Sequence, residues 1–213
     1  MSHSMRIAIA ALLFGALSLP ALADSATYLA TIDTASQIGN YGYIDLELNA
    51  SSFPGSGPVE AAIFNFTGAT LNPLDPANDE LGTASGGLPG PLTLDNSGFN
   101  DSFEGMTFGS DITFDVTLSG SGVSLTGGAP YASGTTFQVL FCDSTCSNTL
   151  FTSDPNTGAA ALLNVAPDGS VEGTGPVTFV PEPGCLSLIL CGSAVMLLII
   201  WRKRPDMETL RGL

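Results

Sequence analysis

Basic residues are almost absent from this chain. Its 213 residues include 20 Asp and Glu but five Lys and Arg, and those five are Arg6 and four residues after position 201. The single histidine is His3. Binding to nucleic-acid phosphates depends on basic side chains, so we expect no nucleic acid partner. Serine and cysteine hydrolases need a neighbouring base, usually His or Lys, so both classes are excluded for the central region.

The missing cations leave the central region strongly acidic. Asp206 and Glu208 lie near the C-terminus, so 18 of the 20 carboxylates fall between residues 24 and 183. No internal ion pair can form there, and the fold must tolerate its own charge repulsion. Divalent cations or an acid-tolerant surface would relieve that repulsion.

The first 23 residues have the features of a secretory signal peptide. Arg6 supplies the positive end, residues 7–19 form a short apolar run, and Ala21 and Ala23 form a small-residue cleavage site before Asp24. We expect signal peptidase to remove residues 1–23, so they do not contribute to the fold. A second membrane anchor is the alternative, but the apolar run is short for it.

An uncharged segment lies near the other end of the chain. Residues 185–201 are 17 residues without a charge, and Arg202, Lys203 and Arg204 follow directly. A helix of that length is about 25 Å long, which is at the short end of what spans a bilayer. Because positive charge resists translocation, we expect a transmembrane helix over 185–201 and a cytoplasmic tail over 205–213. Everything before the helix would then lie outside the inner membrane.

The tripeptide Pro181, Glu182 and Pro183 stands just before this segment. The order of motif, hydrophobic helix and basic cluster resembles the PEP-CTERM sorting signal of Gram-negative bacteria, over about residues 180–204. The resemblance implies recognition by an exosortase, a membrane peptidase, with cleavage near the motif. The chain departs from the family in its nine residues after the basic cluster and in Gly184 and Cys185, where small hydroxyl residues are common.

Residues 24–179 are expected to form one ectodomain between the signal peptide and the C-terminal helix. They are rich in Gly, Ser, Thr and Pro, with short β-favouring runs between turn signals, which predicts an all-β domain, a single jelly-roll-like β-sandwich of two stacked sheets. Residues 72–91 are expected to be a long loop and 166–170 a hairpin turn. The strands are expected at 27–33, 41–49, 59–67, 92–94, 98–108, 111–118, 135–141, 160–165 and 171–179.

Two oxygen-rich groups are candidates for calcium, which prefers carboxylate and amide oxygens. The first is Asp75, Asn78, Asp79 and Glu80 in the expected long loop, and the second lies at 95–101. Neither has EF-hand spacing, so the alternative is a set of solvated loop acids.

A strand over 41–49 places four further side chains on one face, since successive residues point to opposite sides. These are Tyr41, Tyr43, Asp45 and Glu47. Tyrosine rings beside carboxylates could stack on a sugar and bond its hydroxyls, which suits an exopolysaccharide partner. The alternative is a sheet face partly covered by loops, and it is favoured by the lack of Trp before Trp201.

Cys142 and Cys146 are expected to form a disulfide, since disulfides persist in exported domains. A metal site is the alternative, but two thiolates without a histidine are a poor zinc set. The bridge closes a very short loop, so its expected role is to shape that loop.

These features predict an exported, non-enzymatic protein of the cell surface or extracellular matrix, associated with exopolysaccharide. It would pass through an intermediate anchored in the inner membrane. A calcium-dependent carbohydrate-binding module is the alternative. A glycan hydrolase comes third, because nothing in the sequence distinguishes two carboxylates as a catalytic pair.

Overall fold

Hydrogen bonds join the eleven strands of the described part of the chain into one antiparallel sheet. The computed structural model describes residues 25–52, 54–124, 128 and 131–180, and among these it contains no α-helix and one short 3-10 helix, η1 (Ala35–Gln37). The predicted all-β class is confirmed. The strands are β1 (Ser25–Asp33), β2 (Tyr41–Ala50), β3 (Glu60–Leu71), β4 (Asp79–Leu81), β5 (Ser85–Gly86), β6 (Leu92–Asp95), β7 (Asp101–Ser119), β8 (Thr135–Asp143), β9 (Ala161–Val165), β10 (Val171–Thr174) and β11 (Val177–Val180).

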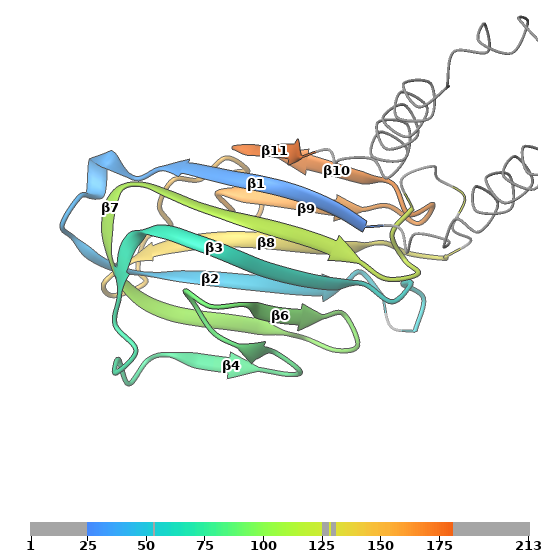
Figure 1. The fold of residues 1–213 in the computed structure, drawn as a ribbon, viewed down its shortest axis with the longest axis horizontal. Coiled ribbons are helices and arrows are strands. Elements are labelled where there is room, and N and C mark those ends of the chain that lie inside the picture. Colours follow the sequence, from blue (N-terminus) through green and yellow to red (C-terminus); the bar gives the residue numbers. More distant parts are fainter. Residues whose placement is uncertain (1–24, 53, 125–127, 129–130, 181–213) are drawn as a thin grey trace, which may run out of the picture. The chain divides into compact units, whose positions relative to one another are not determined.

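The long strand β7 connects the two parts of the sheet. Along one edge, β2 pairs with its first part and β1 with its second part. Along the other edge, β4 pairs with its first three residues, and β3 pairs with it from Met106 to Ser119. From β2 the sheet continues through β8 and β9 to β10, and from β3 it continues through β6 to β5, while β11 pairs with β1 (Figure 1). The separate strands expected at 98–108 and 111–118 are therefore one strand.

The sheet bends where β3 runs beside the middle of β7. The register of β3 shifts twice between Phe64 and Ala69, and Asn65 and Gly68 there have φ angles of 58° and 95°. Such left-handed residues are typical of β-bulges, which bend and twist a strand. A Cβ on Gly68 would collide with the backbone of Asp111 on β7, so glycine is needed for this close approach.

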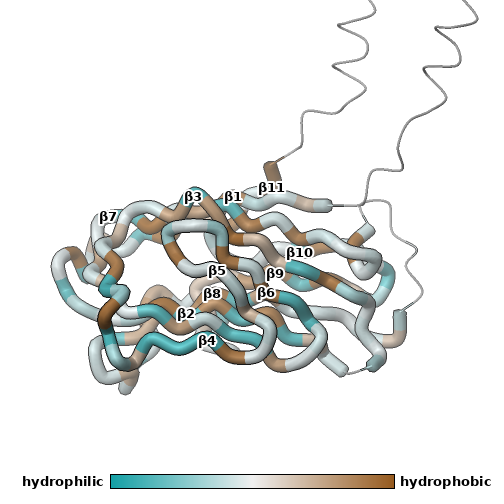
Figure 2. The backbone as a smooth tube through the Cα atoms, turned by 60° about the horizontal axis from the view of Figure 1, so that its bottom comes forward, coloured by the Kyte–Doolittle hydropathy of each residue, from teal (hydrophilic) through white to brown (hydrophobic). Residues whose placement is uncertain are grey.

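The bend brings the two parts of the sheet over one hydrophobic core. Figure 2 shows β1, β3 and β11 along one side of the folded sheet and β2, β4 and β8 along the other. Side chains from β1, β2, β3, β6, β7, β8 and β9 belong to one buried cluster. Its members include the alternating inward residues that the sequence predicts on β2 and β7, namely Ile44, Leu46, Leu48, Ile112, Phe114, Val116 and Leu118.

Several expectations are corrected by the pairing of the strands. The two predicted separate sheets are one continuous sheet, because β7 belongs to both parts. The expected loop over 72–91 contains β4 and β5, and the single strand expected at 171–179 is divided into β10 and β11 by a turn at Gly175, whose φ is 87°. The predicted hairpin turn over 166–170 is confirmed: Ala166 N donates to Ser170 O at 2.8 Å.

The predicted terminal features lie outside the described residues. They are the signal peptide with its cleavage site at Ala21, Ala23 and Asp24, the Pro181, Glu182 and Pro183 motif, the 185–201 helix, the basic residues Arg202, Lys203 and Arg204, and the 205–213 tail. Within the part of the chain that is described, no helix has the length and apolar character needed to cross a membrane.

Candidate functional site

The outward side chains of β2 and the first part of β7 form one surface, which we call the β2–β7 face. On β2 they are Tyr41, Tyr43, Asp45, Glu47 and Asn49, which alternate with buried residues. In register on β7, Thr107 lies opposite Tyr41, Gly105 opposite Tyr43, Phe103 opposite Asp45 and Asp101 opposite Glu47. The four predicted sugar-binding residues therefore share one face, and all four are partly buried.

Aromatic rings cover one part of the β2–β7 face. The rings of Tyr43 and Phe103 are stacked, with centroids 4.7 Å apart and planes at 17°. Tyr41 meets Tyr43 edge to face at 5.6 Å. Diagonal neighbours on adjacent strands are within reach of aromatic side chains, which explains how Tyr43 stacks on Phe103 although its direct partner is Gly105.

One predicted calcium ligand bonds to a predicted sugar-binding residue. The Tyr41 hydroxyl donates to Asp75 Oδ2, and Asn72 Nδ2 donates to the Tyr41 hydroxyl at 3.3 Å. The bond from Tyr41 lowers the pKa of Asp75, while partial burial and then Asp75 raise the pKa of Tyr41. A Cβ on Gly105 would collide with the Tyr41 hydroxyl and approach Asp75 closely, so glycine makes room for this pair.

The other predicted calcium ligands point to different partners. Asn78 Oδ1 accepts from Gly105 N at 2.8 Å, and Asn78 Nδ2 donates to Asn72 O at 2.9 Å. Asp79 and Glu80 are exposed neighbours on β4, so they face opposite sides of the sheet. Among the described residues, no group of three or more His, Cys, Asp and Glu side chains is arranged to hold a metal ion.

The asparagines of the second oxygen-rich group bond to the protein itself. Asn96 is 6% exposed and bonds to Val59, Gly57 and Thr135. Asn100 is fully buried, and its Oδ1 accepts from both the N–H and the hydroxyl of Thr83. These amide oxygens already have donors in the protein.

Three carboxylates form the second part of the β2–β7 face. Glu47 Oε2 accepts from Asn49 Nδ2 at 2.9 Å and from Gln138 Nε2 of β8. Burial, followed by the charges of Glu47 and Asp101, raises the pKa of Asp45 to about 7. Burial and the charge of Asp79 raise the pKa of Asp101. The carboxylates of Asp45 and Asp101 each have one buried oxygen without a hydrogen-bond partner.

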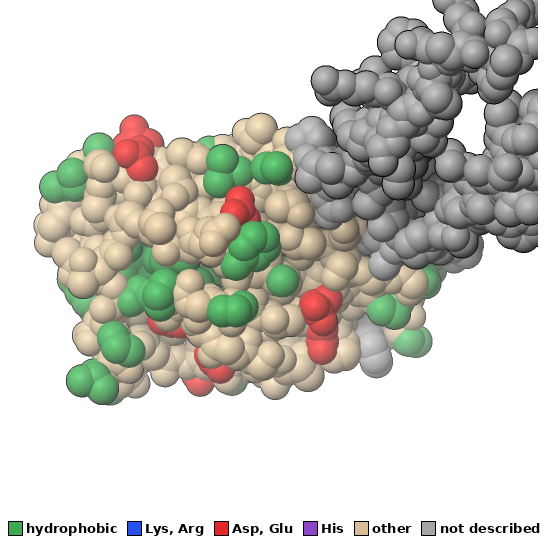
Figure 3. Space-filling view, viewed as in Figure 1, with side chains coloured by type: hydrophobic (Ala, Val, Ile, Leu, Met, Phe, Trp, Pro, Cys, Tyr) green, Lys and Arg blue, Asp and Glu red, His purple; other side chains and the backbone are tan. Residues whose placement is uncertain are grey.

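A cleft of about 460 Å³ lies beside this face, lined by residues that include Glu80, Gly87, Leu88 and Glu104. Glu104 Oε1 accepts from Leu88 N at 3.2 Å, and burial raises the pKa of Glu104 against the lowering effect of that bond. The sequence signal for Glu104 is its inward position between Ser102 and Met106, where a buried strand residue is expected. Figure 3 shows acidic and no basic side chains on the described surface in view.

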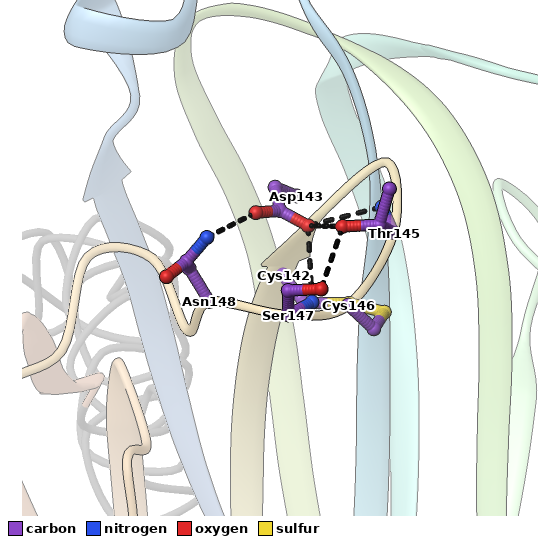
Figure 4. The surroundings of a disulfide bond; sticks show 6 residues. All are labelled: Cys142, Asp143, Thr145, Cys146, Ser147 and Asn148. Carbon is purple, nitrogen blue, oxygen red and sulfur yellow. Dashed lines mark hydrogen bonds between the residues drawn. A yellow bond between two sulfur atoms is a disulfide. The ribbon is translucent and has the colours of Figure 1, made fainter.

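The structure joins Cys142 and Cys146 in a disulfide at the end of β8 (Figure 4). Asp143 holds the same loop: Asn148 Nδ2 donates to its Oδ2 at 2.6 Å, and the Thr145 hydroxyl donates to its Oδ1 at 2.8 Å. The bond from Asn148 contributes most to lowering the pKa of Asp143, followed by those from Thr145, and together they bring it to about 2. Sequence reasoning missed Asp143, although an Asp at the start of a turn commonly bonds the backbone two residues later.

Comparisons with known proteins find no relative of this chain. No protein-family model matches the chain, and neither a curated protein nor a solved structure matches it.

Proposed function

We propose that this protein is an exported, non-enzymatic protein of the cell surface or extracellular matrix, sorted by its C-terminal signal. The observation that carries the proposal is the order of Pro181, Glu182 and Pro183, an uncharged run and Arg202 to Arg204 in a chain that opens with an export signal. Exosortase and signal peptidase are the proposed processing enzymes. The chain would be anchored in the inner membrane before it reaches the surface.

The proposed exported part is the folded sheet, a sandwich-like ectodomain. A β-domain with a disulfide suits an oxidising compartment. The absence of Lys, Arg and His from residues 25–180 gives the ectodomain a uniformly acidic character, which keeps it soluble and disfavours anionic partners. Neutral or cationic exopolysaccharide is the partner class that this charge permits.

Substitution of the motif tests the sorting step. The double variant Pro181→Ala/Pro183→Ala should stay in the membrane fraction at a mass that includes the C-terminal segment. A matched control, Pro73→Ala/Pro76→Ala, changes two prolines in the loop before β4 and should be sorted as the wild type is. Normal release of the motif variant would contradict the proposal.

A calcium-dependent carbohydrate-binding module is the second candidate, favoured by the stacked Tyr43 and Phe103 rings beside carboxylates. Retention of host exopolysaccharide should then fall with EDTA and with Tyr43→Ala. Leu74→Ala removes a side chain that is 90% exposed and should leave retention unchanged. Equal retention by all three proteins, with and without EDTA, would exclude this candidate.

A glycan hydrolase is a weaker third candidate, supported by one feature of the cleft. Such enzymes use two carboxylates across the scissile bond, and Glu80 and Glu104 line the same cleft. Turnover of the polysaccharide that is lost in Glu104→Gln but kept in Glu60→Gln would replace the non-enzymatic proposal.

A further inference from the structure

The edge strands of the folded sheet differ in how they are protected from pairing with another chain. Among the described strands, β4, β5, β10 and β11 each pair with one neighbour. β4 and β10 carry Asp79, Glu80 and Glu172, and β5 is two residues long. Charges and shortness both protect an edge. β11 has neither a charge nor a proline, and its Phe179 and Val180 are 44% and 38% exposed. β11 is therefore the described edge that is open to strand addition.

The backbone of β11 presents hydrogen-bonding groups along its outer edge. In an antiparallel pair, opposed residues alternate between bonded and non-bonded pairs. Thr31 N donates to Pro176 O at 3.0 Å, so this first pair of β1 with the β11 segment is a bonded one. By alternation along the register, Thr178 and Val180 also bond to β1. The N–H and C=O of Phe179 then point away from β1, toward an edge that no described strand covers.

A groove of about 450 Å³ adjoins this edge. Its lining includes Tyr28 of β1, Val177 and Phe179 of β11 and Val171 of β10. The Phe179 ring packs edge to face on Tyr28, with centroids 5.5 Å apart. A Cβ on Gly173 of β10 would lie 2.8 Å from the Val177 side chain, so the two strands approach each other there, although no ladder joins them. A strand added to β11 would turn every second side chain toward the groove.

The place where β11 ends indicates which partner this surface suits. Val180 is followed directly by Pro181, Glu182 and Pro183 in the sequence. A peptidase that cuts near this motif must bind the preceding residues as an extended chain. β11 is already extended, so the fold presents those residues in a preorganised form. A second copy of the chain suits the surface less well, because residues 25–180 have no basic side chain and two acidic domains repel each other.

We propose that the outer edge of β11 and the adjoining groove form the docking surface for the processing peptidase. An extended segment of the peptidase adds to β11, and its uncharged or basic side chains enter the groove. Main-chain bonds to Phe179 hold the segment, and the groove selects its side chains. The inference rests on the proposed sorting function and adds the surface through which the folded domain is recognised together with its motif.

The rate at which the full-length chain is processed in its native host tests this docking. Pulse labelling and mass measurement follow the loss of the residues after Pro183. Phe179→Lys places a charge at the groove and should slow processing by about tenfold, as expected for the loss of one central contact. Thr178→Lys adds the same charge at the next, exposed residue, on the opposite side of β11, and should be processed at the wild-type rate.

A second matched pair approaches the groove from its other wall. Val171→Lys on β10 changes a groove residue and should also slow processing, whereas Glu172→Lys changes its exposed neighbour and should not. Circular dichroism of each full-length variant in detergent checks that it folds. If Phe179→Lys does not fold, Val171→Lys decides the outcome.

Two results would overturn the docking surface. The first is a wild-type chain that is processed, with the groove variants processed at the same rate as their controls. The second is a full-length wild type that is dimeric in detergent by light scattering and monomeric as Phe179→Lys, because a second copy would then occupy the groove. A wild type that stays full length with and without the exosortase would refute the sorting function, and the inference with it. That result differs from a failure of docking alone, in which the wild type is processed.

Discussion

Replacement of Asn96 by alanine should destabilise the fold strongly, because one buried amide joins three segments of the chain. Asn96 Oδ1 accepts from Val59 N at 2.9 Å, and its Nδ2 donates to Gly57 O at 2.8 Å and to Thr135 Oγ1 at 2.6 Å. Val59 and Thr135 are 3% and 2% exposed. These bonds connect the end of β6 to the start of β3 and to β8, on the other side of the core.

The size of the loss follows from the groups that the substitution leaves behind. Asn96→Ala leaves the N–H of Val59, the carbonyl of Gly57 and the hydroxyl of Thr135 without this partner. Each unsatisfied buried group costs about 1–3 kcal/mol. Water can enter part of the vacated space, and the hydroxyl can rotate. We therefore expect a loss of about 3–5 kcal/mol, a large share of a stability of about 5–15 kcal/mol.

Urea unfolding of the full-length chain, followed by circular dichroism with the disulfide intact, measures this loss. Asn156→Ala, at an exposed position, should change the free energy of unfolding by less than about 0.5 kcal/mol. Thr135→Val combined with Asn96→Ala should cost less than the two single changes together, because both remove the same bond. A loss below about 1 kcal/mol for Asn96→Ala would refute the reasoning.

Three further predictions follow from the core, the disulfide and the loop that it closes. Phe137→Ala removes a ring that is 1% exposed and should cost about 3–5 kcal/mol in urea unfolding, whereas an equal cost for Phe99→Ala, at a 58% exposed ring, would contradict the core assignment. Cys142→Ser/Cys146→Ser should cost about 2 kcal/mol or less, because the loop is short and Asp143 still holds it; a loss of the whole fold in reducing agent would be inconsistent with this. The pKa of Asp143 is lowered to about 2, so its bonds stabilise the loop above about pH 4 and are lost as the pH falls through 2. Amide exchange at Thr145 and Ser147 should report that loss, and protection kept at pH 1.5 would exclude Asp143 as its cause.

The parts of the fold that depend on local alternation could be predicted from sequence. Ile112, Phe114, Val116 and Leu118 alternate with polar residues, and the structure buries all four. The continuity of β7 could not be predicted. Gly109 and Ser110 are residue types that commonly end a strand, but here they lie within β7. β4 has no hydrophobic period, so it is defined by its pairing with β7 alone.

The sequence predicted which residues share the candidate site, but it did not predict which of them contact one another. The period of two on β2 placed Tyr41, Tyr43, Asp45 and Glu47 on one face. The bond from Tyr41 to Asp75 joins residues 34 positions apart. The pKa of Asp45 is raised first by burial and then by the charges of Glu47 on the same strand and Asp101 on the neighbouring strand. Asn96 belongs to the second oxygen-rich group, which the sequence offered as calcium ligands. In the structure its side chain bonds instead to Gly57, Val59 and Thr135, which are distant in sequence.

The central claim concerns where the protein goes, and one measurement tests it directly. Intact mass and cell fractionation of the protein from its native host should be compared with and without the exosortase. The account predicts a surface or extracellular form that begins at Asp24 and ends near Pro183 in the wild type, and full-length retention in the membrane without the enzyme. A membrane-bound form that keeps residues 185–201 in both strains would contradict it, and the C-terminal segment would then be a permanent anchor.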